Sequence, residues 1–494
     1  MKSEIHDLRE GRSPSLFHKV RAGGFWVFLL RIVDRAFGIV KIVVTARLLS
    51  PEEFGLFGVA LLAVTICETF TQSGFEGALI QKKEDVKGYL DTAWTIQVVR
   101  GVALFLLLFC LSPVVASFFK TPHVSQLVRV IAVSQLVIGF RNIGVIYFAK
   151  ELDFGRQFVF QFVPSCIDLM VSMVLLFTFK NVWALVIALL VRHTLTTAWS
   201  FVMHDYRPSL RVDWDKARDL FTFGKWALGS GVLYFLLTQG DDLLVGKVLG
   251  AGVLGLYLMA YKISNIPTTE ITNVISYVTF PAFSKLQHEP VKLRRAYLQV
   301  LKVIMFTTFP LALLLFLLAE DFTILILGEQ WRSMVPAMKI LCAVGLVGSF
   351  GATIRPLFYG VGKPGIHTKL SFLHLLVLGC LIYPLTRHMG IVGAAFSVLS
   401  AMTLTQLVAS VMVIRQLKVS YPDFVKLFIF PSAAAAVMGL CVVACQRLVV
   451  ETNLWSLGAV GLMGAGVYLG VCIVFSRLLH YDAIDQVGRL VHSR

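Results

Sequence analysis

The sequence predicts an all-α protein that crosses a membrane about 14 times, and three observations support this fold class. Of the 494 residues, 57% are hydrophobic and only 15% are charged, and the mean hydropathy is +0.78. Apolar runs of about 20 residues, the length that spans a bilayer, recur along the whole chain. Lysines and arginines gather in alternate loops, so the net charge of +16 follows the predicted topology and does not indicate a nucleic-acid partner.

Each predicted span is an apolar run that ends at charged or turn-forming residues. Trp26, Trp94 and Trp183 lie at the starts of such runs, as interfacial anchors do. The most basic loops, at 207–218 and 284–295, lie on the side of both termini, which are therefore predicted to be cytoplasmic. In chain order the spans are 24–47, 55–79, 93–119, 125–147, 158–179, 183–204, 223–247, 253–280, 298–319, 335–358, 369–386, 391–414, 426–446 and 455–477.

An internal repeat links the first two spans to the seventh and eighth. Residues 45–60 are echoed by residues 245–260, where Arg47 recurs as Lys247 and Gly55 as Gly255. The displacement of six spans is an even number, so both copies have the same orientation in the membrane. We expect two six-helix lobes, 1–222 and 223–425, related by a pseudo-two-fold axis along the membrane normal. Residues 426–494 would add two helices and a cytoplasmic C-terminal tail.

Four ionisable residues, Arg31, Asp34, Arg35 and Lys41, occur in the first predicted span. Their spacing places them on one face of a helix. Each would cost roughly 2.5–3.5 kcal/mol if it faced lipid at the bilayer centre, so they should face one another or water. Two interpretations follow: the stripe lines a hydrated pathway, or Asp34 simply neutralises Arg31 or Arg35.

Ionisable residues inside other predicted spans favour a hydrated interior shared by several helices. Arg100 and Arg192 add further cations, whereas His193 and His374 are interpreted as hydrogen-bonded packing residues. The acidic candidates for carrying a coupling ion are Asp34, Glu68, Asp168, Asp241, Asp242 and Glu270. Neither metal-ligand spacing nor a nucleophile or phosphate-binding motif is present, so we expect no metal, no cofactor and no enzyme activity.

Five segments carry a recognisable pattern over roughly residues 25–415. They are ARLLSPEEFGLFG at 46–58, TQSGFEGALIQKKE at 71–84, QGDDLLVGKVLGAGVLGLY at 239–257, FPAFSKLQ at 280–287 and LGEQWRSMVPAMKILCAVGL at 327–346. Together they resemble the polysaccharide-transport branch of the multidrug/oligosaccharidyl-lipid/polysaccharide (MOP) flippase superfamily. Within that branch the likeness is to Wzx-type exporters, especially the colanic-acid type.

The resemblance implies an exporter in the bacterial inner membrane. Such a protein flips an undecaprenyl-diphosphate-linked oligosaccharide to the periplasmic leaflet by alternating access, for exopolysaccharide, capsule or O-antigen synthesis. Its partners would be this lipid-linked substrate, the surrounding lipids, H⁺ or Na⁺ as coupling ion, and the polysaccharide polymerase machinery. The cations expected to attract the diphosphate or acidic sugars are Arg31, Arg35, Lys41, Arg100 and Arg192.

Three alternatives remain open at this point. A drug or metabolite antiporter of the same superfamily would bind a cation, and the cationic first span argues against it. A lipid II flippase would share the carrier lipid but act on a different headgroup. A membrane glycosyltransferase or polymerase is a third possibility, and the short periplasmic loops disfavour it because such enzymes normally carry a sizeable loop on that side.

Overall fold

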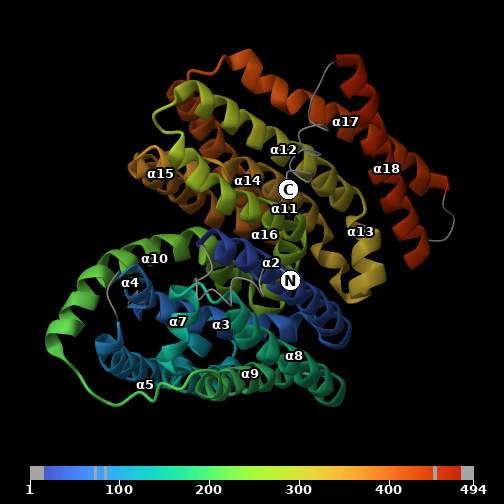
Figure 1. Ribbon diagram of the computed structural model, residues 1–494. Helices are drawn as coiled ribbons and strands as arrows, with labels where there is room; N and C mark the ends of the chain where they lie inside the picture. Colours follow the sequence, from blue (N-terminus) through green and yellow to red (C-terminus); the bar gives the residue numbers. More distant parts are fainter. Residues whose placement is uncertain (1–15, 72–74, 83–85, 449–452, 480–494) are drawn as a thin grey trace, which may run out of the picture. The chain divides into compact units, whose positions relative to one another are not determined.

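The computed structural model describes residues 16–71, 75–82, 86–448 and 453–479, and within these ranges it contains helices and no strands. Figure 1 shows the helices in chain order. The helices are α2 (Leu16–Leu48), α3 (Pro51–Thr71), α4 (Phe75–Gln81), α5 (Lys87–Phe118), α6 (Val124–Gly139), η1 (Ile143–Val145), α7 (Ile146–Lys150), α8 (Phe154–Phe179), α9 (Val182–Met203), α10 (Trp214–Leu249), α11 (Ala251–Lys285), α12 (Pro290–Leu317), α13 (Ala319–Phe322), η2 (Thr323–Leu327), η3 (Glu329–Met334), α14 (Val335–Gly351), α15 (Ile354–Gly360), α16 (Pro364–Leu417), α17 (Tyr421–Leu448) and α18 (Leu454–Leu479).

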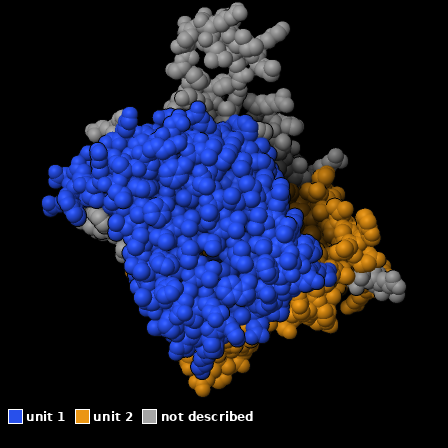
Figure 2. All heavy atoms as spheres, turned by 90° about the horizontal axis from the view of Figure 1, so that it is seen from below, with its two compact units in different colours: residues 1–235 blue, residues 236–494 orange. Residues whose placement is uncertain are grey.

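The chain divides into two compact units, which Figure 2 colours separately: unit 1 is Met1–Phe235 and unit 2 is Leu236–Arg494. The division falls inside α10 and is close to the predicted lobe boundary at 222/223. Unit 2 also contains α17 and α18, which pack on each other and on α12. Tyr468 of α18 is buried and donates a hydrogen bond to the carbonyl of Phe306 in α12 over 2.8 Å.

Unit 1 is held together by close helix crossings. At the crossing of α5 and α6, Gly101 and Gly139 face each other so closely that a Cβ on Gly101 would lie 2.8 Å from the Cα of Gly139. Only glycine lets two backbones approach in this way, and small residues serve this purpose in membrane helix pairs. α6 in turn packs on α3 and α9, and α8 packs on α2 and α9.

The predicted span at 125–147 is wrong as a single helix. α6 ends at Gly139, and the chain bends by 70° before η1 and α7. Asn142 caps the start of η1 after this bend: its side-chain oxygen accepts from the Gly144 backbone N–H at 2.8 Å, and its amide donates to the Tyr206 carbonyl at 2.7 Å. A side chain that bonds to its own backbone competes with helix continuation.

In unit 2, α16 contains two predicted spans in one element of 54 residues. Gly390 interrupts it with φ 61° and ψ −141°, a backbone conformation in which a side chain would be strained. The two halves fold back on each other, because residues on both sides of Gly390, such as His374 and Gln406, line one cavity. The predicted loop at 387–390 is therefore a sharp turn.

Nine described helices are long and apolar enough to cross a membrane, or ten if the bent pair of α6 with η1 and α7 counts as one span. α16 holds two predicted spans, and three more fall on α2, α10 and α11, which carry ionisable residues along their length. The structure is thus compatible with 14 spans, and that count stays a prediction.

Candidate functional site

The clearest arrangement of ionisable side chains in unit 1 surrounds Asp168 of α8. Lys41 of α2 donates to both carboxylate oxygens, over 3.2 Å to Oδ1 and 3.1 Å to Oδ2. Arg192 of α9 also approaches this carboxylate, with Nη1 3.7 Å from Oδ2. Ser172, one turn further along α8, donates its hydroxyl to Oδ1 over 3.3 Å. We call Lys41, Asp168, Ser172 and Arg192 the Asp168 cluster.

The Asp168 cluster has an excess of positive charge. Asp168 is only 8% exposed, whereas Lys41 is 28% and Arg192 48% exposed. A buried carboxylate is tolerated only where cations and hydrogen bonds compensate its lost hydration, and here two cations serve one carboxylate. Among the described residues the guanidinium of Arg192 makes no hydrogen bond, so its five N–H donors are available to an anion.

The position of Lys41 follows from how α2 packs on α8. Trp26 contacts Phe158 with ring centroids 5.0 Å apart, and Phe37 stacks on Phe162 at 6.5 Å. These aromatic contacts lie on the same side of α2 as Lys41 and fix the register of the two helices. The cation therefore meets Asp168 because the apolar neighbours define where α2 sits along α8.

The other ionisable residues of α2 are arranged differently. Arg31 and Asp34 are exposed on the helix and form no ion pair with each other, and Arg35 is half-buried. The described side chains therefore do not support the interpretation in which Asp34 neutralises Arg31. Their exposure is compatible with a face of α2 that meets water.

Arg100 of α5 belongs to a second group, at the end of α3. Its Nε donates to the Thr71 hydroxyl over 3.2 Å, and its Nη2 donates to the backbone carbonyl of Glu68 over 3.3 Å. The last carbonyls of a helix lack partners within the helix, and Arg100 satisfies one of them. Arg100 thus has a structural role at the end of α3. Of the three cations that the sequence grouped together, only Lys41 and Arg192 meet around one carboxylate.

The acidic pair of α10 lies in unit 2 and is buried. Asp241 is 4% and Asp242 6% exposed, and Asp241 Oδ2 accepts a hydrogen bond from the hydroxyl of Tyr257 over 2.7 Å. Among the described residues neither aspartate forms an ion pair with a lysine or arginine. The sequence pattern does not indicate Tyr257 as this partner, although Tyr257 directly follows Gly255 and Leu256 of the second copy of the repeat. Glu270 lies on α11, and its side chain is outside the described part of the structure.

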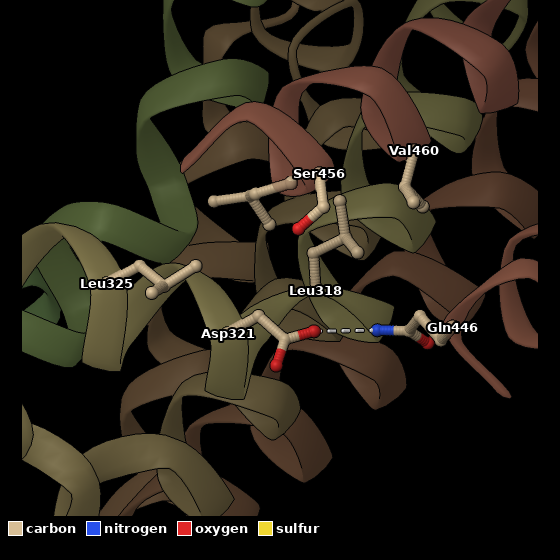
Figure 3. Close-up of a pocket in the computed structure, with 7 residues that line it drawn as sticks. Leu318, Asp321, Leu325, Gln446, Ser456 and Val460 are labelled. Carbon is tan, nitrogen blue, oxygen red and sulfur yellow. Dashed lines mark hydrogen bonds between the residues drawn. The ribbon is translucent and has the colours of Figure 1, made fainter. Parts of the chain in front are cut away.

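No three His, Cys, Asp or Glu residues gather in a metal-binding arrangement within the described residues. A small pocket of unit 2, drawn in Figure 3, contains Asp321, whose Oδ2 accepts from the Gln446 amide over 3.0 Å. Its volume is about 20 Å³, which is room for one water or little more. It is too small for a sugar or a phosphate.

Comparisons with known proteins indicate the family of this chain. The family described as "Polysaccharide biosynthesis protein" matches residues 44–336, more than half of the chain. The lipopolysaccharide biosynthesis protein WzxC of Escherichia coli K12 is 26% identical over 72% of this chain and 73% of its own length. The teichuronic acid biosynthesis protein TuaB of Bacillus subtilis 168 is 26% identical over 68% of this chain and 70% of its own length.

Among solved structures, the lipid II flippase MurJ in an inward closed conformation aligns with a TM-score of 0.72. The alignment covers 91% of this chain and 98% of MurJ at 17% identity, so it shows the fold and nothing finer. It confirms the prediction of an all-α multi-pass membrane protein. The family match, the relatives and the fold agree with the resemblance in the sequence, and this chain is a member of the polysaccharide biosynthesis protein family.

Proposed function

We propose that this protein flips an undecaprenyl-diphosphate-linked oligosaccharide repeat unit from the cytoplasmic to the periplasmic leaflet of the bacterial inner membrane. The relatives are named for the synthesis of lipopolysaccharide and teichuronic acid, which supports a polysaccharide precursor as the cargo. A sugar headgroup carries many hydroxyls that are costly to desolvate, so it needs a polar route through the hydrocarbon. Alternating access of two lobes, 1–222 and 223–425, would open that route to one side at a time, with both termini in the cytoplasm.

The observation that carries the proposal is the excess of cations around Asp168. Lys41 and Arg192 share one buried carboxylate, and Arg192 keeps its donors available. A diphosphate could approach Arg192 through charge-assisted hydrogen bonds while Asp168 holds Lys41 in place. Arg31 and Arg35 on the same helix as Lys41 would extend the positive surface, and Arg100 would contribute at longer range. A cation antiporter would need the opposite charge balance.

Export would be coupled to an ion through one of the six acidic candidates. Asp241 and Asp242 are the choice that we favour, because two adjacent buried carboxylates without a paired lysine or arginine need either a proton or a small cation. Asp168 is less suited, since Lys41 and Arg192 already neutralise it. Asp34, Glu68 and Glu270 remain further candidates.

Deletion of the gene tests the function. We expect an undecaprenyl-linked oligosaccharide to accumulate on the cytoplasmic side and the corresponding surface polysaccharide to be lost, and both effects to be reversed by the wild-type gene. Arg192→Glu, Arg31→Glu and Arg35→Glu, expressed at wild-type level, should complement poorly. Normal display of every surface polysaccharide in the deletion strain, without an accumulated intermediate, would refute the proposal.

A further inference from the structure

Unit 2 contains a cavity that the cationic site does not explain. It lies among α10, α14, α15 and both halves of α16, and its volume is about 210 Å³. One water occupies only about 10–15 Å³ of such space, so the cavity can accommodate a ligand group as well as solvent. It is about ten times larger than the pocket at Asp321.

The polar residues that line the cavity are all neutral hydrogen-bonding groups or imidazoles. His367, Ser371 and His374 occupy positions i, i+4 and i+7 on one face of the first half of α16, and Thr405 and Gln406 come from the second half. Among the described residues that line it, none is a carboxylate, lysine or arginine. The remaining wall is apolar. This combination of donors, acceptors and apolar surface suits an uncharged polyhydroxylated ring, which presents hydroxyls at its edge and C–H groups on its faces.

Several of these polar groups have unused hydrogen-bonding capacity. The side-chain oxygen of Gln406 is buried without a hydrogen-bond partner. Within the described residues His374 forms neither a hydrogen bond nor an ion pair, so the expectation of a hydrogen-bonded packing histidine is wrong there. Leaving a buried acceptor without a partner is unfavourable, and a hydroxyl of a ligand would satisfy it.

Three glycines shape the cavity. Gly390 reverses the chain and brings His374 and Gln406 to the same space. A Cβ on Gly351 of α14 would collide with the amide of Gln406, and one on Gly348 would lie 2.9 Å from Cε of Met402. The wall that carries Gln406 can thus approach α14 only because both positions lack a side chain. His367 is held from outside by Tyr359, with ring centroids 5.9 Å apart.

We propose that this cavity of unit 2 binds one uncharged sugar residue of the cargo, as a site separate from the cations of unit 1 that attract the diphosphate. The proposal rests on the proposed function for its choice of a sugar as ligand. The two sites would bind different parts of the cargo. The cations of unit 1 would bind the invariant anionic carrier, and the cavity of unit 2 would bind a neutral part of the variable oligosaccharide.

The test uses the full-length protein in nanodiscs with two kinds of probe. The neutral probes are the methyl glycosides of glucose, galactose and N-acetylglucosamine, observed by saturation-transfer difference NMR. The anionic probe is undecaprenyl diphosphate incorporated in the nanodisc, measured by co-purification. The cavity variants are Gln406→Leu, Ser371→Ala and Gly351→Val, and the matched control is His388→Phe, which changes an exposed histidine of the same helix outside the cavity.

We expect at least one neutral glycoside to bind the wild type and His388→Phe, and Gln406→Leu to weaken it about tenfold, the equivalent of one hydrogen bond of about 1.4 kcal/mol. Undecaprenyl diphosphate should bind all cavity variants normally, which also shows that they are folded, and should be lost in Lys41→Met with Arg192→Met. If none of the three glycosides binds the wild type, or if Gln406→Leu and Gly351→Val bind the glycosides as tightly as the wild type does, the cavity is not a sugar site. If the glycosides behave as expected but undecaprenyl diphosphate does not bind, the proposed function fails and the sugar site stands.

Discussion

At the scale of single residues, we expect substitution of Asp168 to lower stability the most. In Asp168→Asn, Lys41 and Arg192 would lose the carboxylate that both of them pair with. The remaining cations are 28% and 48% exposed and can be hydrated, so the loss is that of hydrogen bonds to a charged group, about 1.5–3 kcal/mol, and we expect a clear fall in the unfolding temperature in detergent. Fluorescence-detected size-exclusion chromatography after heating measures it.

Two further variants make this prediction specific. Ser172→Ala removes only one hydroxyl donor to the same carboxylate and should cost about 1 kcal/mol. Adding Lys41→Met to Asp168→Asn should restore part of the lost stability, because the repulsion between the cations is removed. If Asp168→Asn were as stable as Ser172→Ala, the Asp168 cluster would not be an electrostatic unit.

Substitution by glutamine should affect export at Arg192 and thermal stability at Arg100. Arg192→Gln removes a half-exposed guanidinium that makes no hydrogen bond with the described residues, so export should fall while thermal stability changes little. Arg100→Gln breaks hydrogen bonds to Thr71 and to the Glu68 carbonyl, so stability should fall by about 1–3 kcal/mol. Surface polysaccharide display and unfolding temperature, measured on both variants at equal expression, separate the two roles; the same change of stability in both would contradict the assignment.

The different outcomes for Lys41 and Arg100 show what the sequence can predict of the site. Helical periodicity indicates which face of a helix is polar, and it places Lys41 on the polar stripe of the first span. It does not say which polar residue on one helix meets which on another, because that register is set by apolar contacts such as Trp26 with Phe158. Hydrogen bonds to backbone carbonyls, as made by Arg100, leave no pattern in the sequence.

At the scale of helices, the crossing of α5 and α6 depends on Gly101 and Gly139. Gly139→Val would place a branched side chain where the two backbones are in contact, and overpacking of this kind costs about 1–3 kcal/mol. We expect a lower unfolding temperature and reduced amounts of protein in the membrane. Gly379→Val on α16 is the control, since a Cβ there has no neighbour within 4 Å. Equal effects of the two variants would mean that the close crossing is not required.

The positions of most helices could be predicted from hydropathy, because bilayer thickness fixes the length of an apolar run. The interruptions could not be predicted in the same way. The predicted span ran through the bend before Asn142, whose amide donates to the carbonyl of Tyr206, more than 60 residues away in sequence. Hydropathy indicates a loop at 387–390, but it does not indicate that the chain reverses at Gly390, with φ 61° and ψ −141°.

At the scale of the whole molecule, the two compact units differ in polar chemistry. Unit 1 gathers cations around Asp168, whereas unit 2 contains the buried acids Asp241 and Asp242 and the neutral cavity at His374 and Gln406. The shared residues of the repeat, such as Gly55 and Gly255, belong to the helix junctions. We infer that the repeat specifies the scaffold, while the residues that differ between the copies specify the cargo and the coupling ion.

An anionic cargo makes export sensitive to the membrane potential. Moving one negative charge outward in an inside-negative membrane releases about 2.3 kcal/mol per 100 mV. The membrane potential therefore favours export of the anionic cargo. In proteoliposomes whose potential is fixed by potassium and valinomycin, we expect a fluorescent undecaprenyl-diphosphate oligosaccharide to flip faster towards the positive side and to slow on depolarisation. A pH or sodium gradient held constant isolates the potential from ion coupling, and protein-free liposomes give the background.

Arg192→Gln should lower the rate at every potential, because it weakens capture of the anion and leaves the charge of the cargo unchanged. A rate that is independent of potential at fixed ion gradients would show that the cargo crosses with its charge compensated, for instance by a cation carried in the same direction.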